Sequence, residues 1–332
     1  MKINFSSVFF GPVIVSLLSL IAVSYFSGLN ALILVIILSI LEVTLSFDNA
    51  VVNAKVLERM TPRWQRRFLT WGIAIAVFGT RFVLPILIVS AATFASPILI
   101  TTLAFTDPGE YGRLLETVDG SITAFGGVFL LMVALKYFFN QTKEVHWLSA
   151  IEKNLVSWGR IEALEIAVAL ITLTSLSFFT HFSQVEVLVA GIIGLILFVV
   201  MEGIAGSLSI EGDSVVKSGL ALFVYLNILD SAFSLDGVVG AFALSSDLLI
   251  IVVGLGIGAY FVRALTLNFV QKKTLTELVY LEHGAHWAIL GLAAAMLVSL
   301  LIEVPEVITG LVGLVFVSLS YRSSLKELAR IN

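Results

Sequence analysis

Two similar motifs place acidic side chains inside long apolar runs. The segment LEVTLSFDNAVVNA contains Glu42, Ser46 and Asp48, and the segment LDSAFSLDGVVGA contains Asp230, Ser234 and Asp236 at the same spacing. A charged side chain at the centre of a bilayer costs at least ~2.5 kcal/mol on insertion scales. These carboxylates are therefore expected to face the protein interior, where each pairs with another group, takes up a proton or binds a cation.

Helical geometry adds further oxygen-bearing side chains to each motif. At ~100° per residue, the residues on one face of the first helix are Glu42, Ser46, Asn49 and Asn53, and those of the second are Asn227, Asp230, Ser234 and Gly237. Asp48 and Asp236 lie about 120° away from these stripes in an ideal helix. Either each helix is broken near its Ser-x-Asp sequence, which Gly237 and Gly240 favour in the second copy, or both residues face another neighbour, such as an arginine.

Two arginines, one after each motif, also lie within apolar runs. Together with the four acids they leave an excess of negative charge that one divalent cation would neutralise. Carboxylate, hydroxyl and amide oxygens are hard ligands that suit Mn²⁺, Mg²⁺ or Ca²⁺, whereas the motifs lack the His and Cys that favour Zn²⁺ or Cu(I). The expected metal ligands are Glu42, Ser46, Asp48, Asn49, Asp230, Ser234 and Asp236, with Arg81 and Arg263 as ion-pair or gating residues and Asn53 and Asn227 as further candidates.

The buried charges have two alternative roles. The acids and arginines could form ion pairs that only hold helices together, although two arginines cannot compensate four acids. The carboxylates could instead carry protons without a metal. No nucleophile and base pair is evident, so we expect neither an enzyme nor a resident cofactor.

A second group of polar residues begins a later apolar run. It contains Glu282, His283 and His286. The two histidines are three residues apart, so they share a helix face and could bind a metal or cap the helix at the membrane interface. Glu162 and Glu165 stand at the start of the fifth predicted span and Glu202 at the end of the sixth, where they could line a vestibule or only be solvated.

The composition predicts helices that span a membrane. Hydrophobic residues make up 59% of the chain and charged residues 13%, which is about half of the charged share in globular proteins. Apolar runs close to the ~20 residues that cross a bilayer predict an all-α polytopic protein, a single membrane domain over residues 1–332. The spans, about ten, are expected near 8–26, 31–57, 67–92, 121–140, 160–180, 184–204, 217–245, 247–271, 284–302 and 305–321, with a half-helix or interfacial segment at 93–105.

Basic residues indicate the orientation of the spans. The loop ERMTPRWQRRF after the second span contains four arginines, and further Lys and Arg follow the fourth and eighth spans and end the chain. With ten spans, all of these lie on one side, and the opposite side carries acids with Arg113 alone. The positive-inside rule then places both termini in the cytoplasm.

The two motifs belong to a longer repeat. Each motif is followed by a span with one arginine and then by a Gly-rich span, so the repeat units are three helices each, over 31–140 and 217–303. Residues 141–216 connect them with two spans, and 304–332 supply the last span and a cytoplasmic tail. Because the units begin an odd number of spans apart, they have opposite orientations, a recurring design of transporters.

The paired motifs resemble those of the TerC family of integral membrane proteins. The likeness rests on E-x-x-x-S-x-D-N at Glu42, Ser46, Asp48 and Asn49 and on D-x-x-F-S-x-D at Asp230, Phe233, Ser234 and Asp236, and the length is similar to that of an uncharacterised bacterial branch. The resemblance implies a multi-pass protein of the bacterial inner membrane that exports a divalent cation, with Mn²⁺ first and with a link to tellurium-ion resistance. Gly237, where the family usually has a polar residue, is a departure.

Two hypotheses of function follow. In the first, a metal ion moves by alternating access through a site between the second and seventh spans, with protons taken up by the same carboxylates. In the second, the chain is a membrane scaffold for a stress-response or membrane-insertion complex, with loops 141–159 and 205–216 as docking surfaces. The expected partners are the metal ion and the lipid bilayer, with no nucleic acid. The sequence does not decide whether the chain forms a homo-oligomer or binds stress-response partners.

Overall fold

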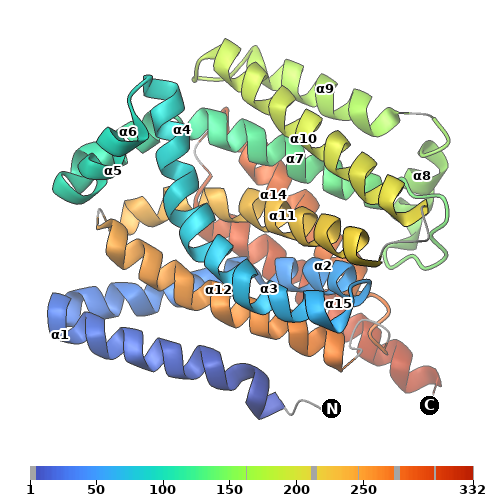
Figure 1. Ribbon diagram of the computed structural model, residues 1–332. Coiled ribbons are helices and arrows are strands. Elements are labelled where there is room, and N and C mark those ends of the chain that lie inside the picture. Colours follow the sequence, from blue (N-terminus) through green and yellow to red (C-terminus); the bar gives the residue numbers. More distant parts are fainter. Residues whose placement is uncertain are drawn as a thin grey trace.

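The computed structural model describes residues 5–161, 163–210, 215–245, 247–272, 277–302 and 304–331. Within these ranges it leaves out the side chains of 5–7, 204–210, 215–218, 235–236, 239–240, 242–243, 306–310 and 331. The described part of the chain consists of helices joined by loops and contains no strand (Figure 1). The prediction of an all-α protein is confirmed.

The helices run back and forth along one bundle (Figure 1). In chain order they are α1 (Phe5–Leu45), α2 (Phe47–Glu58), α3 (Pro62–Ala74), the π-helix η1 (Ile75–Val83), α4 (Leu84–Thr93), α5 (Pro97–Thr106), α6 (Pro108–Thr117), α7 (Asp119–Phe138), α8 (Ser149–Trp158), α9 (Leu164–Ser177), α10 (Gln184–Ile210), α11 (Val215–Leu244), α12 (Leu248–Gln271), α14 (Leu281–Ser299) and α15 (Glu306–Ile331). The beginning of α1 and the end of α15 lie at the same end of the bundle.

Six helical segments in the described ranges are long and apolar enough to cross a membrane. They are Val8–Leu45, Pro62–Thr93, Asp119–Phe138, Gln184–Gly203, Leu248–Gln271 and Leu281–Ser299, and the shorter apolar segments are Pro97–Thr106, Leu164–Ser177 and Gly219–Ser234. Large apolar side chains such as Leu18, Ile21 and Phe26 point outward. The protein is therefore a membrane-embedded helical bundle.

The first helix contains a sharp turn. Gly28 has φ 82° and ψ −177° inside α1, between the predicted spans 8–26 and 31–57. Glycine adopts this φ readily because it has no Cβ. Figure 1 shows the two halves of α1 folded back on each other beside α12, so this turn separates the two predicted spans.

The second predicted span is interrupted within its motif. α1 ends at Leu45, Ser46 (φ −98°, ψ 15°) lies between the helices, and α2 begins at Phe47. The helix break predicted near the Ser-x-Asp sequence is therefore present in the first motif. In the second motif the expected break is wrong, because α11 continues through Gly237 and Gly240.

Other boundaries also differ from the predictions. The apolar segment predicted at 93–105 contains α5, whose N-cap Ser96 accepts a hydrogen bond from the Leu99 N–H at 3.2 Å. The predicted loop 141–159 contains the helix α8. The predicted cytoplasmic tail is helical, because α15 continues to Ile331.

Two glycines bring α12 against α1. A Cβ on Gly254 would lie 2.6 Å from the Cβ of Leu38, and a Cβ on Gly258 would lie 2.5 Å from that of Glu42. The Ser39 hydroxyl donates a hydrogen bond to the carbonyl oxygen of Gly254 at 2.9 Å. The sequence GLGIGA at residues 254–259 of α12 therefore allows close helix packing, the role that small residues commonly have in membrane bundles.

The two Gly-rich spans of the predicted repeat pack against each other. A Cβ on Gly126 of α7 would lie 2.7 Å from Met296 Cε of α14, and one on Gly127 would lie 3.0 Å from Leu297. Both helices contribute to the largest cluster of buried apolar side chains, which includes Phe129. This contact holds together the parts of the chain that carry the two motifs.

Candidate functional site

The acid of the first motif is paired with the arginine of the following helix. Glu42 on α1 and Arg81 on η1 form an ion pair, and both side chains are at least 95% buried. Ser46 donates a second hydrogen bond to Glu42 Oε1 at 3.0 Å. The carboxylate is thus compensated within the membrane-embedded bundle.

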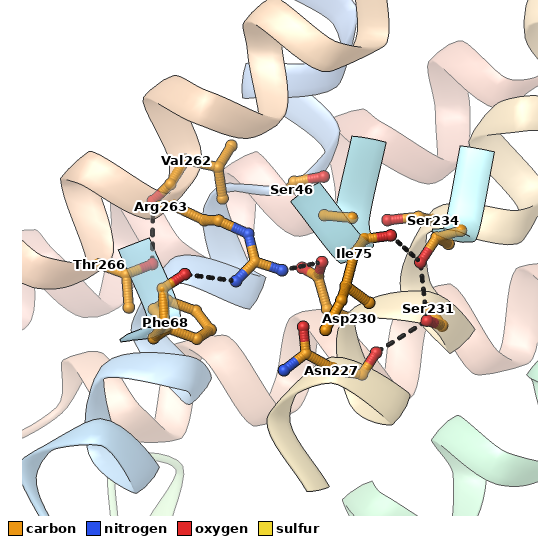
Figure 2. Close-up of polar contacts among 12 residues, drawn as sticks. Ser46, Phe68, Ile75, Asn227, Asp230, Ser231, Ser234, Val262, Arg263 and Thr266 are labelled. Atoms are coloured by element: carbon orange, nitrogen blue, oxygen red, sulfur yellow. Dashed lines mark hydrogen bonds and ion pairs between the residues drawn. The ribbon is translucent and has the colours of Figure 1, made fainter. Parts of the chain in front are cut away.

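The second motif contains the equivalent ion pair. Arg263 Nη2 on α12 donates to Asp230 Oδ2 on α11 at 2.7 Å (Figure 2). The guanidinium group also lies over the ring of Phe68 and donates to its carbonyl oxygen at 3.4 Å. Gly72 makes room for this arginine, because a Cβ there would lie 2.6 Å from Arg263 Nη1.

Each arginine also reaches from its own predicted repeat into the other. Arg81 donates to Ser234 Oγ of α11 at 3.3 Å, and Arg263 donates to the Phe68 carbonyl of α3. The second half of α1 and α11 run in opposite directions (Figure 1). The two pairs therefore belong to corresponding motif positions in antiparallel segments.

Hydroxyl groups make a second link between η1 and α11, beside the contact of Arg81 with Ser234. Thr80 Oγ1 of η1 lies 2.8 Å from Ser231 Oγ of α11, and Ser231 donates to the Asn227 carbonyl oxygen at 2.7 Å (Figure 2). The wider backbone of the π-helix carries both Thr80 and Arg81, and Arg81 Nη1 donates back to the Ala76 carbonyl at 2.8 Å.

The third polar feature is a set of buried side chains that lack either an ion pair or a hydrogen-bond donor to an amide oxygen. Asp48, Asn49 and Asn53 of α2 are only 4%, 2% and 1% exposed. Asp48 forms no ion pair with a described residue. The Oδ1 atoms of Asn49, Asn53 and Asn227 accept no hydrogen bond within the described ranges. Because buried acceptors normally have a donor, these oxygens are suited to a cation.

The predicted metal ligands are thus brought together only in part. Glu42, Ser46 and Ser234 meet around Arg81, whereas Asp230 lies against Arg263. The side chain of Asp236 lies outside the described residues. Among the side chains that are described, no three of His, Asp and Glu gather into a cluster that could hold a metal.

The comparisons with known proteins place the chain in one family. A family model described as "Protein of unknown function (DUF475)" matches residues 47–330. The chain belongs to the DUF475 family. The match covers Asp48, Arg81, the whole second motif and Arg263, and it begins just after Glu42 and Ser46. No curated protein and no solved structure matches the chain.

The structure of this DUF475 protein also contains a buried acid that the sequence analysis missed. Glu152 of α8 is fully buried and joins the connecting segment to α14. It accepts hydrogen bonds from His283 Nδ1 at 2.8 Å and from Trp287 Nε1 at 3.1 Å, and it lies 3.1 Å from Lys143 Nζ. The sequence feature related to this contact is the i, i+4 spacing of His283 and Trp287, which places both hydrogen-bond donors to Glu152 on one face of α14.

The contacts of Glu152 determine its ionisation. Burial by itself raises the pKa of this carboxyl, but the hydrogen bonds from His283 and Trp287 and the charge of Lys143 together lower it to about 2. Burial also lowers the pKa of Lys143, although Glu152 opposes this change. The carboxylate is therefore ionised at neutral pH and fixes α8 to α14.

The two histidines have separate partners. His283 is bonded to Glu152, whereas His286 Nδ1 lies 2.8 Å from the Glu282 carbonyl oxygen and its ring stacks on Tyr137 at 3.6 Å. Glu282 forms an ion pair with Lys55 at 3.0 Å. The candidate residues Glu282, His283 and His286 therefore do not share a single metal ion in this structure.

Proposed function

We propose that this protein transports a divalent metal cation across the membrane, with Mn²⁺ export as the first expectation. The transport mechanism is alternating access, in which the two antiparallel halves move relative to each other around the buried motifs. Asp48 and the second-motif acids supply negative charge, and Asn49, Asn53 and Asn227 supply neutral oxygen ligands. The resemblance of the paired motifs to the TerC family supports the choice of a hard divalent ion.

One observation carries the proposal. Equivalent acid and arginine pairs, Glu42 with Arg81 and Asp230 with Arg263, are buried in antiparallel segments. Asp48, which follows Glu42 in the same motif, is a buried carboxylate that has no ion-pair partner among the described residues. A buried carboxylate without a cation partner is costly. A transported cation, or a proton in its absence, removes that cost.

The arginines have a role in this mechanism when no metal is bound. Arg81 and Arg263 then neutralise Glu42 and Asp230. As a cation approaches, the released carboxylates turn toward it and the guanidinium groups keep their contacts with Ser234 and with the Phe68 carbonyl. Because arginine does not lose its proton in proteins, each guanidinium group stays charged when its carboxylate partner leaves.

Flux measurements with purified protein in liposomes test the proposal. A fluorescent indicator reports the movement of Mn²⁺, with Mg²⁺, Ca²⁺ and Zn²⁺ in parallel. Asp48→Asn is expected to reduce Mn²⁺ flux at least about tenfold, since even residues that only support metal ligands cost 10–100-fold. The matched control is Glu116→Gln, which is expected to leave flux unchanged. Glu116 is an exposed acid on α6, at the end of the bundle away from α2.

Two outcomes would refute transport. If wild-type protein moves none of the four ions faster than empty liposomes, the hypothesis that this protein alone transports a divalent cation is excluded. Mn²⁺ flux that is equal in wild type and in Asp48→Asn would exclude a role of this carboxylate in the ion pathway.

A further inference from the structure

A polar cavity opens between helices of both predicted repeats. It has a volume of about 410 Å³ and is bounded by α2, α7, α9, α10, α11 and α14. Asn140 and Gly159, which flank the loop that carries α8, also line it. In Figure 1 this loop lies at the end of the bundle where α1 begins and α15 ends. The positive-inside rule assigns this end to the cytoplasm.

The cavity has an excess of carboxylates. Its lysine, glutamate and histidine lining residues are Lys55, Lys136, Glu165, Glu202, Glu282 and His286. Lys55 is paired with Glu282 at 3.0 Å, and Lys136 lies 3.9 Å from Glu202, whereas Glu165 forms no ion pair with a described residue. Three carboxylates against two ammonium groups make the cavity attractive to cations.

His286 gives an independent indication of a ligand. The residue is buried, with only 8% of its surface exposed. Its Nδ1 faces the Glu282 carbonyl oxygen at 2.8 Å, and a carbonyl only accepts, so Nδ1 carries the proton. Nε2 then has a free lone pair and no hydrogen bond from a described residue. Metal-binding histidines are typically oriented in this way, with the other ring nitrogen donating to a carbonyl.

The size of the cavity fits an ion that keeps its water. About six waters surround a small divalent cation, and at ~30 Å³ for each water they need roughly 180 Å³. The cavity of about 410 Å³ therefore accommodates the hydrated ion. Contact through water also agrees with the lack of a direct cluster of three His, Asp or Glu ligands among the described residues.

The cavity leads to the helix that carries the buried oxygens. Val52 and Val56 of α2 line it, and Asn53 and Asn49 lie on the same helix in the protein interior. The Lys55–Glu282 pair joins α2 of the first predicted repeat to α14 of the second. Movement of one repeat against the other would separate this pair.

We propose that this cavity is a vestibule that receives a hydrated divalent cation from the cytoplasmic side, with His286 and the carboxylates as its binding groups. The Lys55–Glu282 ion pair is the gate of the vestibule. The approaching cation replaces the Lys55 ammonium group at Glu282, and the ion then passes to the Asp48 region. This inference rests on the proposed function, because it gives the transported ion its route of access.

The absence of cysteine from the chain makes the test direct. Val133→Cys and Val128→Cys are matched variants on α7, both at buried valines, but only Val133 lines the cavity. Each variant is treated in nanodiscs with a cationic or an anionic thiosulfonate reagent. Val133→Cys is expected to react with the cationic reagent at least about tenfold faster than with the anionic one. Mn²⁺ is expected to slow that reaction, and Val128→Cys is expected to react with neither.

A second variant tests the gate. Adding Glu282→Gln to Val133→Cys removes one carboxylate and frees Lys55, so the preference for the cationic reagent is expected to fall by several-fold. Equal labelling of Val133→Cys and Val128→Cys, or labelling that Mn²⁺ and Glu282→Gln leave unchanged, would overturn the vestibule. Labelling does not depend on flux, so a failed vestibule leaves the Asp48 flux result intact, and a failed flux result leaves the labelling result intact.

Discussion

At the scale of single residues, the arginines divide the buried acids into two kinds. Glu42 and Asp230 are paired with Arg81 and Arg263, whereas Asp48 forms no ion pair with a described residue. Removing two charges from water often costs more than their attraction returns. Ion pairs at these positions are therefore poorly explained by stability alone. In the proposed transport mechanism, reversible release of these carboxylates to a cation would be the function of the ion pairs.

Glu152 is a different kind of buried acid, because its contacts are structural. Glu152→Gln is expected to lower the apparent melting temperature by several degrees at neutral pH, since breaking a buried ion pair costs about 3–5 kcal/mol. The variant leaves Lys143 without its negative partner and weakens the hydrogen bond from His283. Thermal unfolding in detergent, followed by tryptophan fluorescence, measures the effect.

The stability that Glu152 provides also depends on pH. The pKa of about 2 in the folded protein lies below the ordinary value of 4.5. The contribution is therefore complete above pH 4.5 and is lost as the pH falls toward 2. Wild type and the control Glu144→Gln, at an exposed acid nearby, are expected to lose stability in this window. Glu152→Gln is expected to lose less, and identical slopes in all three proteins would contradict this role.

At the scale of elements, hydrophobic length predicted most of the helices. Apolar runs identified the positions of α7, α10, α11, α12 and α14 to within a few residues. The short helix α8 was not predicted, because Glu152 is buried by His283 and Trp287 from a distant segment. The span predicted at 217–245 is present as the continuous helix α11, and only the alternative of a break near Gly237 is wrong, because this glycine lies within an unbroken helix.

Close packing of α1 on α12 gives a prediction at this scale. Gly258→Ala places a methyl group 2.5 Å from Glu42 Cβ and 2.8 Å from the Ser39 carbonyl oxygen. Overpacking of this kind costs typically about 1–3 kcal/mol, so both the melting temperature and Mn²⁺ flux are expected to fall. Gly203→Ala on α10 is the control, because nothing lies within 4 Å of its Cβ. The same melting temperature for both variants would contradict the close contact.

At the scale of the whole molecule, the position of the buried polar site was easier to predict than which acid pairs with which arginine. The spacing of Glu42, Ser46 and Asp48 in an apolar run indicated a buried polar site from the sequence alone. The sequence left open whether Arg81 pairs with Glu42 or with Asp48. That choice depends on how η1 and α1 pack, and the structure places Arg81 against Glu42. The partner of an arginine depends on how the helices pack, and the spacing of residues along one helix does not give this information.

The orientation of the bundle is the last prediction. The end with α8 carries most of the basic residues, and the end with α6 is mainly acidic, so the positive-inside rule places α8 in the cytoplasm and α6 outside. Single cysteines in this cysteine-free chain report the two sides. In intact bacterial cells, a membrane-impermeant maleimide is expected to label Glu116→Cys on α6. Asn154→Cys on α8 is expected to react only after permeabilisation. The reverse pattern would invert the bundle and move the vestibule to the outer face, which would make it an exit for an exported ion or an access route for an imported one.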